Sequence, residues 1–181
     1  MEIKDSGERR QFESGAVRDI QNGKGRCDLL PLEQVARFIE LYGDIDTTGG
    51  LSEIINEIDN FMLTRQDTCI YSAINKFICY NYDEKYISAI LSLSKHYEDG
   101  ARKYDERNWE KGIPLHCYID SGLRHLLKFY SDWKDEPHDR AFLWNMFGLL
   151  WTMKNKPDMD DLPKARLNNA ENKDSNKEPG I

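Results

Sequence analysis

One segment near the C-terminus sets the strictest limit on the fold. From Ala141 to Met153 the sequence is apolar on nearly every side of a helix, and such a helix has to be buried. Along the same helix His138, Asn145 and Thr152 recur every seven residues. An unpaired buried polar group costs about 1 to 3 kcal/mol, so this narrow stripe has to find partners. A structural hydrogen-bonded Asn fits this pattern as well as a functional one does.

The remaining apolar residues also follow helical spacing, and no internal repeat is present. The spacing predicts helices over about 32–42, 51–62, 69–82, 83–104 and 115–130, and a last one through 153. The Ile, Phe and Tyr residues of 69–82 also favour a strand. Residues 1–13 are expected to be frayed, and residues 44–50, DIDTTGG, to form a loop before a helix that Ser52 caps. Asp135 or Glu136 is expected to cap the last helix, with Pro137 in its first turn. The predicted class is an all-α helical bundle.

Length and charge narrow the function. A chain of 181 residues suits one domain, here 1–154, and the polar segment 155–181 reads as a disordered tail. The net charge of −7 argues against binding duplex nucleic acid, and no apolar run reaches the roughly 18 residues of a membrane span. Four cysteines without CxxC spacing indicate reduced thiols, as in a cytoplasm.

The segment DEPHD, residues 135–139, places four potential metal ligands in five positions. Glu136 and Asp139 are three apart, so they can share one helical face and one cation. Oxygen ligands of this kind suit Mg²⁺ or Mn²⁺. The alternative is capping, because acidic residues favour the positive end of a helix. Capping explains one acid well, and three acids with a His less well.

The segment RDIQNGKGRCD places Arg18, Lys24 and Arg26 around two glycines. Glycine lets the backbone approach a ligand, and Lys and Arg donate hydrogen bonds to phosphate. The spacing is not that of a P-loop. A flexible charged loop explains the segment equally well.

Two helices carry charges beside their apolar faces. The expected core face of the first comprises Ile90, Leu93, Tyr97, Ala101 and Tyr104. Glu98 and Asp105 lie on one flank of it, and His96 and Lys103 on the other. In the second helix Asp120 and Arg124 are spaced to form a pair, and His125 points away from the apolar face. Solvated flanks and a surface ion pair explain each helix taken alone.

Four blocks in order resemble a known family. They are GAVRDIQNGKGRCDLLPLE, HYEDGARKYDERNWEKGIPL, DSGLRHLLKF and DEPHDRAFLWNM. Together they resemble the phage and bacterial dATP/dGTP diphosphohydrolase N-terminal domain family, which is similar to the all-α MazG-type nucleotide pyrophosphohydrolases. The match covers about residues 14–32 and 96–154. Residues 41–94, about fifty, stand where the family has a short link, and they are interpreted as an insertion: a helical pair, a lid or a partner surface.

The resemblance implies roles for these residues. Carboxylates of Glu98, Asp120, Glu136 and Asp139 would hold Mg²⁺ or Mn²⁺, with His125 and His138 as ligands or their hydrogen-bond partners. Catalysis would rest on Glu98, Asp120, Glu136 and Lys103, with the metal activating the water that attacks phosphorus. Phosphate charge would be neutralised by Lys24, Arg26, Lys103 and Arg124. Asp28 or Asn108 would read the base edge, Trp109 or Tyr104 would stack on the base, and Asn145 would line the substrate site.

The leading hypothesis is therefore an enzyme that cleaves a deoxypurine nucleoside triphosphate to the monophosphate and pyrophosphate. We expect it to act as a homo-oligomer, a dimer or tetramer, in the cytoplasm of a bacterium or a phage-infected cell. The alternative is a non-catalytic nucleotide-binding or protein-interaction module of the same fold, which the long insertion favours. A purely structural helical protein is a third possibility, which the four-block match disfavours.

Overall fold

The computed structural model describes residues 7, 9–19, 45–82 and 86–163, without the side chains of residues 45–49, 86 and 87. A two-stranded hairpin of β1 (Arg9–Gln11) and β2 (Val17–Asp19) precedes the helices. These are α2 (Ile45–Thr64), α3 (Asp67–Asn81), α4 (Tyr86–Tyr104), α5 (Leu115–Tyr130) and α6 (His138–Asn155). Two short 3₁₀ helices, η2 (Asn108–Lys111) and η3 (Pro157–Met159), complete the described elements. The predicted all-α class is confirmed.

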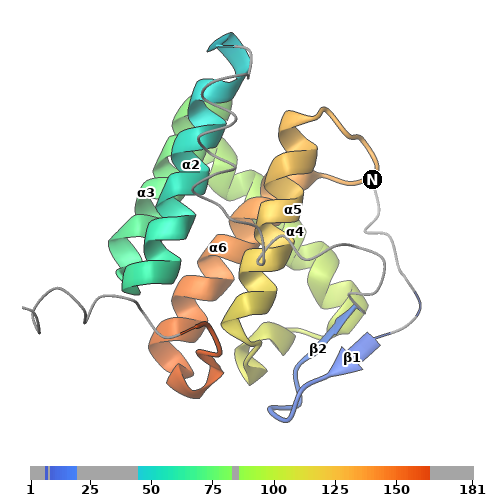
Figure 1. The fold of residues 1–181 in the computed structure, drawn as a ribbon. Helices are drawn as coiled ribbons and strands as arrows, with labels where there is room; N and C mark the ends of the chain where they lie inside the picture. The colour runs from blue at the N-terminus through green and yellow to red at the C-terminus, as the bar shows by residue number, and fades with distance from the viewer. Residues whose placement is uncertain (1–6, 8, 20–44, 83–85, 164–181) are drawn as a thin grey trace, which may run out of the picture.

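The helices α5 and α6 form the centre of the bundle (Figure 1). The pair α2–α3 packs against one side of them, and α4 packs against α6. Apolar residues of both pairs meet in one core, where the ring of Phe77 on α3 lies 4.7 Å from that of Phe142 on α6. Residues 45–82 of the predicted insertion are therefore a helical pair that shares the core of the bundle.

Small residues bring α5 and α6 close together. A Cβ atom on Gly148 would lie 2.6 Å from the ring of Tyr118, and one on Gly122 would lie 2.6 Å from the terminal methyl of Met146. The predicted polar stripe of α6 is buried, with His138, Asn145 and Thr152 between 0 and 2% exposed. Thr152 donates a hydrogen bond to the hydroxyl of Tyr118 (3.2 Å). Asn145 lines a cavity described below, and His138 contacts His125, a residue of the cavity wall.

The predicted loop at 44–50 is wrong, because α2 already begins at Ile45. Gly50 lies inside the helix against the ring of Tyr80, with a ring carbon 2.6 Å from where a Cβ would stand. Glycine is thus used here for close packing between α2 and α3. Ser52 consequently lies within the helix, where it is buried, and does not cap it.

The expected core face of α4 is wrong by about one residue at its start. Ile90 is 56% exposed, whereas Ala89 and Leu93 are buried against the bundle. Neighbouring residues of a helix point about 100° apart, so a shift of one position in the buried face exchanges a buried for an exposed side chain. Leu91 is also exposed.

The N-terminal segment and the start of α6 differ from expectation. Residues 9–11 were expected to be frayed but pair with 17–19, in the register Arg10 opposite Arg18, around a turn in which Gly15 has φ = 83°. Strands of three residues are too short to show a period-2 pattern. At α6 the N-cap is Pro137, and neither Asp135 nor Glu136 caps the helix through its side chain.

The chain beyond α6 stays packed past the predicted tail boundary at residue 155. Leu162 is buried, and Asp160 accepts a hydrogen bond from Nε of Arg65 (3.0 Å) at the end of α2. Asp161 accepts one from the backbone N–H of His116 (3.1 Å). Residues 164–181 of the predicted tail lie outside the described residues.

Candidate metal and phosphate site

A cavity of about 990 Å³ opens between the hairpin, the C-terminal part of α4, η2 and one face of α5. Asp120, Arg124 and Lys128 follow one another along the α5 wall at helical spacing. The loop before α6 closes one end with Asp135 and Glu136. Within the described part of the chain, none of the lining residues comes from α2 or α3.

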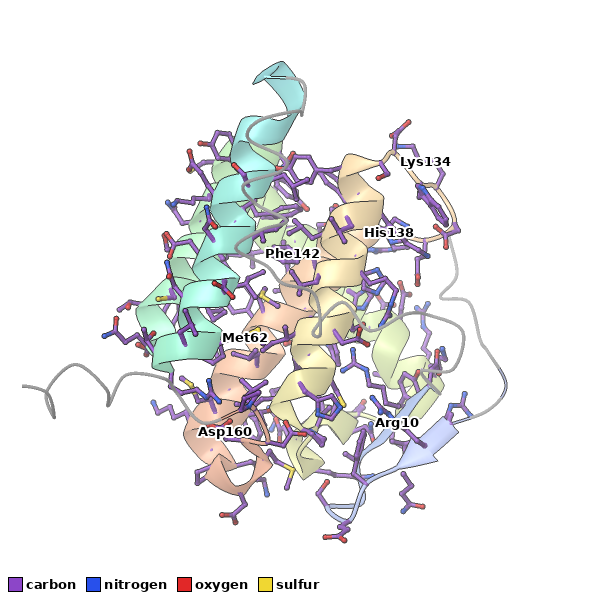
Figure 2. All side chains as sticks on the ribbon, in the orientation of Figure 1. Arg10, Met62, Lys134, His138, Phe142 and Asp160 are labelled. Carbon is purple, nitrogen blue, oxygen red and sulfur yellow. The ribbon has the colours of Figure 1, made fainter. Side chains whose placement is uncertain are left out.

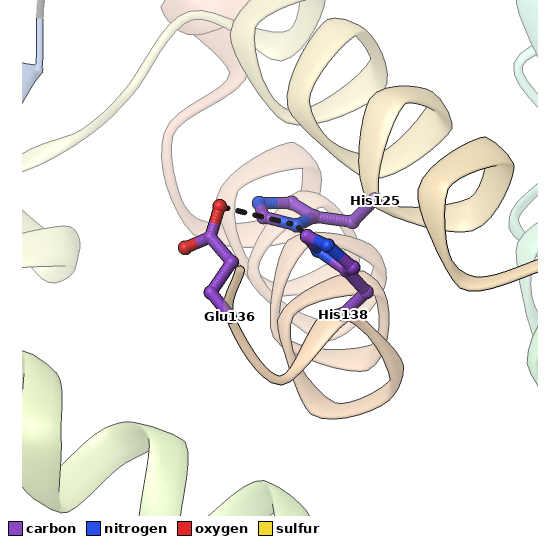
Figure 3. Close-up of side chains that lie close together, drawn as sticks. All are labelled: His125, Glu136 and His138. Atoms are coloured by element: carbon purple, nitrogen blue, oxygen red, sulfur yellow. Dashed lines mark hydrogen bonds and ion pairs between the residues drawn. The ribbon is translucent and has the colours of Figure 1, made fainter. Parts of the chain in front are cut away.

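At this end of the cavity three potential metal ligands meet: His125 from α5, Glu136 from the loop and His138 from the start of α6 (Figure 3). One ligand atom of each lies within 4.8 Å of those of the others. The two Nδ1 atoms of the histidines are 3.0 Å apart, and that of His125 lies 4.0 Å from Oε1 of Glu136. We call these three residues the His–Glu cluster.

Asp135, which is not part of the cluster, orients the imidazole of His138. Its carboxylate contacts Nε2 of His138 (2.7 Å) and accepts a hydrogen bond from Nζ of Lys128 (2.8 Å). The hydrogen bond from Lys128 is the main reason that the pKa of Asp135 lies below its ordinary value. Burial, with the charges of nearby basic groups, holds the pKa of His125 well below its ordinary value. The imidazole of His125 is therefore neutral at neutral pH, the form that binds metals.

The middle of the cavity is basic. Arg124 donates a hydrogen bond to Asp120 (2.5 Å), a carboxylate that is almost fully buried on the same wall. Arg18 reaches in from β2 and donates to Oδ1 of Asn145 (2.7 Å) on α6. The guanidinium of Arg18 lies over the rings of Tyr118 (5.6 Å) and Trp144 (5.8 Å).

The far end combines aromatic and amide groups. The ring of Trp109 lies 5.8 Å from that of Tyr97, edge to face, and both line the cavity. Asn108 is 6% exposed, donates from Nδ2 to the carbonyl of Val17 (3.2 Å), and has a buried Oδ1 atom without a hydrogen-bond partner in the described structure. Such an acceptor suits a ligand N–H group.

Most of the predicted site residues lie together. The cavity is lined by Lys103, Tyr104, Asn108, Trp109, Asp120, Arg124, His125, Glu136 and Asn145, and His138 contacts His125 from behind. Lys103 is also held by Asp19, with Nζ 3.2 Å from Oδ2, and Tyr104 donates to the other oxygen of that carboxylate (2.7 Å). Lys24, Arg26 and Asp28 lie outside the described residues.

Two predicted ligands are not brought to the cavity. Glu98 has an exposed side chain that pairs with Arg102, one helical turn on. Asp139 accepts hydrogen bonds from Tyr82 (2.8 Å) and Ser92 (3.4 Å), on the side of α6 that faces α3 and α4. Spacing put Glu136 and Asp139 on one helical face, but Glu136 precedes the helix, so the two carboxylates diverge.

The sequence does not predict the place in the cavity of three residues that shape it. The sequence pattern marks Asp135 as a potential metal ligand or a helix cap; its position three residues before His138 also allows the contact with the imidazole that the structure shows. Trp144 was counted as part of an apolar helix, and no pattern marked it as a cavity wall. Arg18 was grouped with loop cations, because the strand that carries it is too short to recognise.

Comparisons with known proteins agree with this picture in the C-terminal half. No helix among the described residues has the length and apolar character needed to cross a membrane. Neither the curated proteins nor the solved structures gave a match to the chain. Residues 80–162, from the end of α3 to just beyond η3, match the family described as dATP/dGTP diphosphohydrolase, N-terminal. The family resemblance predicted from the sequence is thus confirmed for residues 96–154, which contain the whole His–Glu cluster. The first predicted block, residues 14–32, lies outside the match, and residues 80–94, which were predicted as part of the insertion, lie inside it.

Proposed function

We propose that this protein hydrolyses a deoxypurine nucleoside triphosphate, dATP or dGTP, to the monophosphate and pyrophosphate with the help of a divalent metal ion. One observation carries the proposal: the His–Glu cluster lies at one end of a basic, partly aromatic cavity, within a segment that matches a diphosphohydrolase family. Its volume of about 990 Å³ is at the upper end of small-molecule sites, which suits a nucleotide with its phosphates.

The donor atoms of the cluster fit a divalent transition metal. Two imidazole nitrogens and one carboxylate oxygen leave coordination positions for water and phosphate, as catalytic metal sites require. Imidazole ligands favour Mn²⁺ and its neighbours over Mg²⁺, which prefers oxygen. We therefore expect stronger support by Mn²⁺ than by Mg²⁺. A bound ion would polarise a phosphoryl oxygen and lower the pKa of a water molecule.

The residues of the chain would bind and orient the nucleotide around this end. Lys128 and Arg124 stand on the α5 wall beside the cluster and can neutralise phosphate charge. Asp120 holds Arg124 in position through their 2.5 Å hydrogen bond. At the far end the base would lie against Trp109, with the free Oδ1 of Asn108 accepting a hydrogen bond from it.

The test is a product assay on the full chain. Each deoxynucleoside and ribonucleoside triphosphate is incubated with Mn²⁺ or Mg²⁺, and the products are separated by ion-exchange chromatography. We expect dAMP or dGMP with pyrophosphate, lost on addition of EDTA and in Glu136→Gln. Glu57→Gln is the matched control, because Glu57 is equally buried (20% against 22% side-chain exposure) but pairs with Lys76 on the α2–α3 side.

Absence of turnover for every nucleotide with both metals would contradict the enzyme and favour the nucleotide-binding alternative. Release of inorganic triphosphate in place of pyrophosphate would show that the enzyme cuts between the nucleoside and the α-phosphate. The homo-oligomer and the bacterial or phage-infected cytoplasm stay predictions.

A further inference from the structure

Arg18 is held in the cavity by neutral groups. Its Nη2 atom donates to the amide oxygen of Asn145 (2.7 Å), and its guanidinium lies over two aromatic rings. Its Nη1 atom is buried and has no hydrogen-bond partner among the described residues. A buried N–H donor without an acceptor is energetically unfavourable. Nη1 of Arg18 therefore suits a ligand that accepts a hydrogen bond from it.

The charges around Arg18 point to the sign of that ligand. No carboxylate of the described residues forms an ion pair with it, and its charged neighbours include the cations Arg10 and Arg124. Burial is the main cause of a lowered pKa for this guanidinium, with the two neighbouring arginines adding to it. Asp120, on the same wall, is engaged by Arg124. The surroundings of Arg18 therefore favour an added anion.

The position of Arg18 relates this anion to the metal. Asn145 and His138 lie on the same face of α6, seven residues apart, which corresponds to about 10 Å along the helix. On the other side, the Trp144 ring under the Arg18 guanidinium lies 6.3 Å from the ring of Tyr97 at the aromatic end. Arg18, which has Arg124 as a charged neighbour, therefore lies between this end and the His–Glu cluster.

We propose that Arg18, positioned by Asn145, anchors a phosphate group of the bound nucleotide, with the phosphate chain running from Arg18 toward the His–Glu cluster. The identity of the anion as a nucleotide phosphate rests on the function proposed above. Asn145 then acts as a positioning residue. Its Nδ2 donates to the carbonyl of Ala141 (2.8 Å) and its Oδ1 accepts from Arg18, so the side chain is used on both sides.

A purely structural role makes a different prediction. Arg18 would then serve to attach the hairpin to α6, and its loss would lower stability without changing anion affinity. The substitution Asn145→Asp separates the two roles, because it provides an ion-pair partner for Arg18 at the place where the neutral amide stands. The new carboxylate should preserve the attachment while opposing an anion.

The experiment measures binding of inorganic tripolyphosphate to the full chain in EDTA by isothermal titration calorimetry. For Arg18→Met we expect affinity to fall by about tenfold or more, the worth of a charge-assisted hydrogen bond. Arg18→Lys should recover part of it, since Lys keeps the charge but not the forked geometry. Asn145→Asp should weaken binding comparably, with an unchanged or raised urea midpoint. Arg65→Met is the control, since Arg65 pairs with Asp160 far from the cavity.

Affinities within twofold of the wild type in folded Arg18→Met, or in Asn145→Asp, would overturn the proposal. If Arg18→Met does not fold, Asn145→Asp decides alone. The two proposals fail separately. Arg18-dependent tripolyphosphate binding without hydrolysis of any nucleotide would leave the anchor standing and remove the enzyme, and hydrolysis with Arg18-independent binding and KM would do the reverse.

Discussion

The Nδ1 atoms of His125 and His138 lie 3.0 Å apart, although one residue belongs to the last turns of α5 and the other begins α6. The connection between the two helices thus folds back so that Glu136 also reaches this point. Two nitrogens facing each other at this distance can share one proton or one metal ion. The metal-binding capacity proposed for the protein depends on this helix–loop–helix geometry.

Asp135 should control metal affinity without being a ligand. Its carboxylate contacts Nε2 of His138, the residue labelled in Figure 2, and accepts a hydrogen bond from Lys128. We expect Asp135→Asn to lower Mn²⁺ affinity by about 10 to 100-fold, because the partner that orients the imidazole is weakened. Calorimetric Mn²⁺ titration checks this. The control is Asp132→Asn, an exposed acid in the same connection, and equal affinities for both variants would contradict the assigned role.

Glu136 and Asp139 should separate into a ligand and a structural acid. Asp139→Asn is expected to lower the free energy of unfolding by about 1 to 3 kcal/mol, since the buried hydroxyl of Tyr82 loses a charged acceptor. Glu136→Gln is expected to reduce Mn²⁺ binding with little effect on stability. Urea denaturation and Mn²⁺ titration of both variants test the pair. Loss of metal binding in Asp139→Asn at unchanged stability would show that the acids share one ion.

The close packing of α5 and α6 predicts an order among glycine substitutions. Gly148→Ala should destabilise by about 1 to 3 kcal/mol, because the new methyl meets the fully buried ring of Tyr118. Gly122→Ala should cost less, since it meets the flexible end of Met146. Gly100→Ala, in α4 with nothing within 4 Å of the added carbon, should stabilise by about 0.5 to 1 kcal/mol. Thermal unfolding of the three variants measures the order, and a Gly148→Ala protein as stable as Gly100→Ala would refute it.

His96 should make the protein less stable in mild acid. Burial, with the charge of Arg140 as a second cause, lowers the pKa of His96 to about 4 from its ordinary 6.5. Between these values the unfolded chain takes up a proton that the folded protein refuses, so the free energy of unfolding falls as pH falls through this window. The full effect is at most about 3 kcal/mol.

Urea denaturation at pH 7.5 and pH 4.5 tests this for the wild type and His96→Gln. The variant lacks the titrating group, so its stability should fall less between the two pH values. Equal losses in both proteins would assign the acid sensitivity to other groups.

The central helices were predictable because their sequence leaves few alternatives. The apolar surround of α6 required burial, and its stripe of His138, Asn145 and Thr152 required partners, which the structure provides. The start of α2 was not predictable, since Gly50 serves helix–helix contact with Tyr80, a residue far along the chain. Helix propensity describes glycine without tertiary contacts, whereas here the contact with Tyr80 determines that glycine stands inside the helix.

The sequence predicted which residues form the site better than it predicted how they are placed relative to one another. Glu136, His125 and His138 were all singled out, but spacing alone grouped Glu136 with Asp139, which the start of α6 at His138 separates. Glu98 lay on a plausible flank of α4, but its side chain is exposed and pairs with Arg102 on the same helix. The hairpin that carries Arg18 depends on a turn and a pairing register that three-residue strands do not reveal.

The cavity is lined by two stretches of the chain, and only one of them matches the family. The segment that matches the family holds the three candidate ligands, whereas Arg18 enters from β2, some sixty residues earlier than residue 80. A polypeptide cut down to 80–162 would keep the candidate ligands and lose Arg18, which lines the same cavity. Boundaries chosen for expression by family similarity would therefore remove the hairpin side of the cavity, and we expect such a fragment to lack the proposed phosphate anchor.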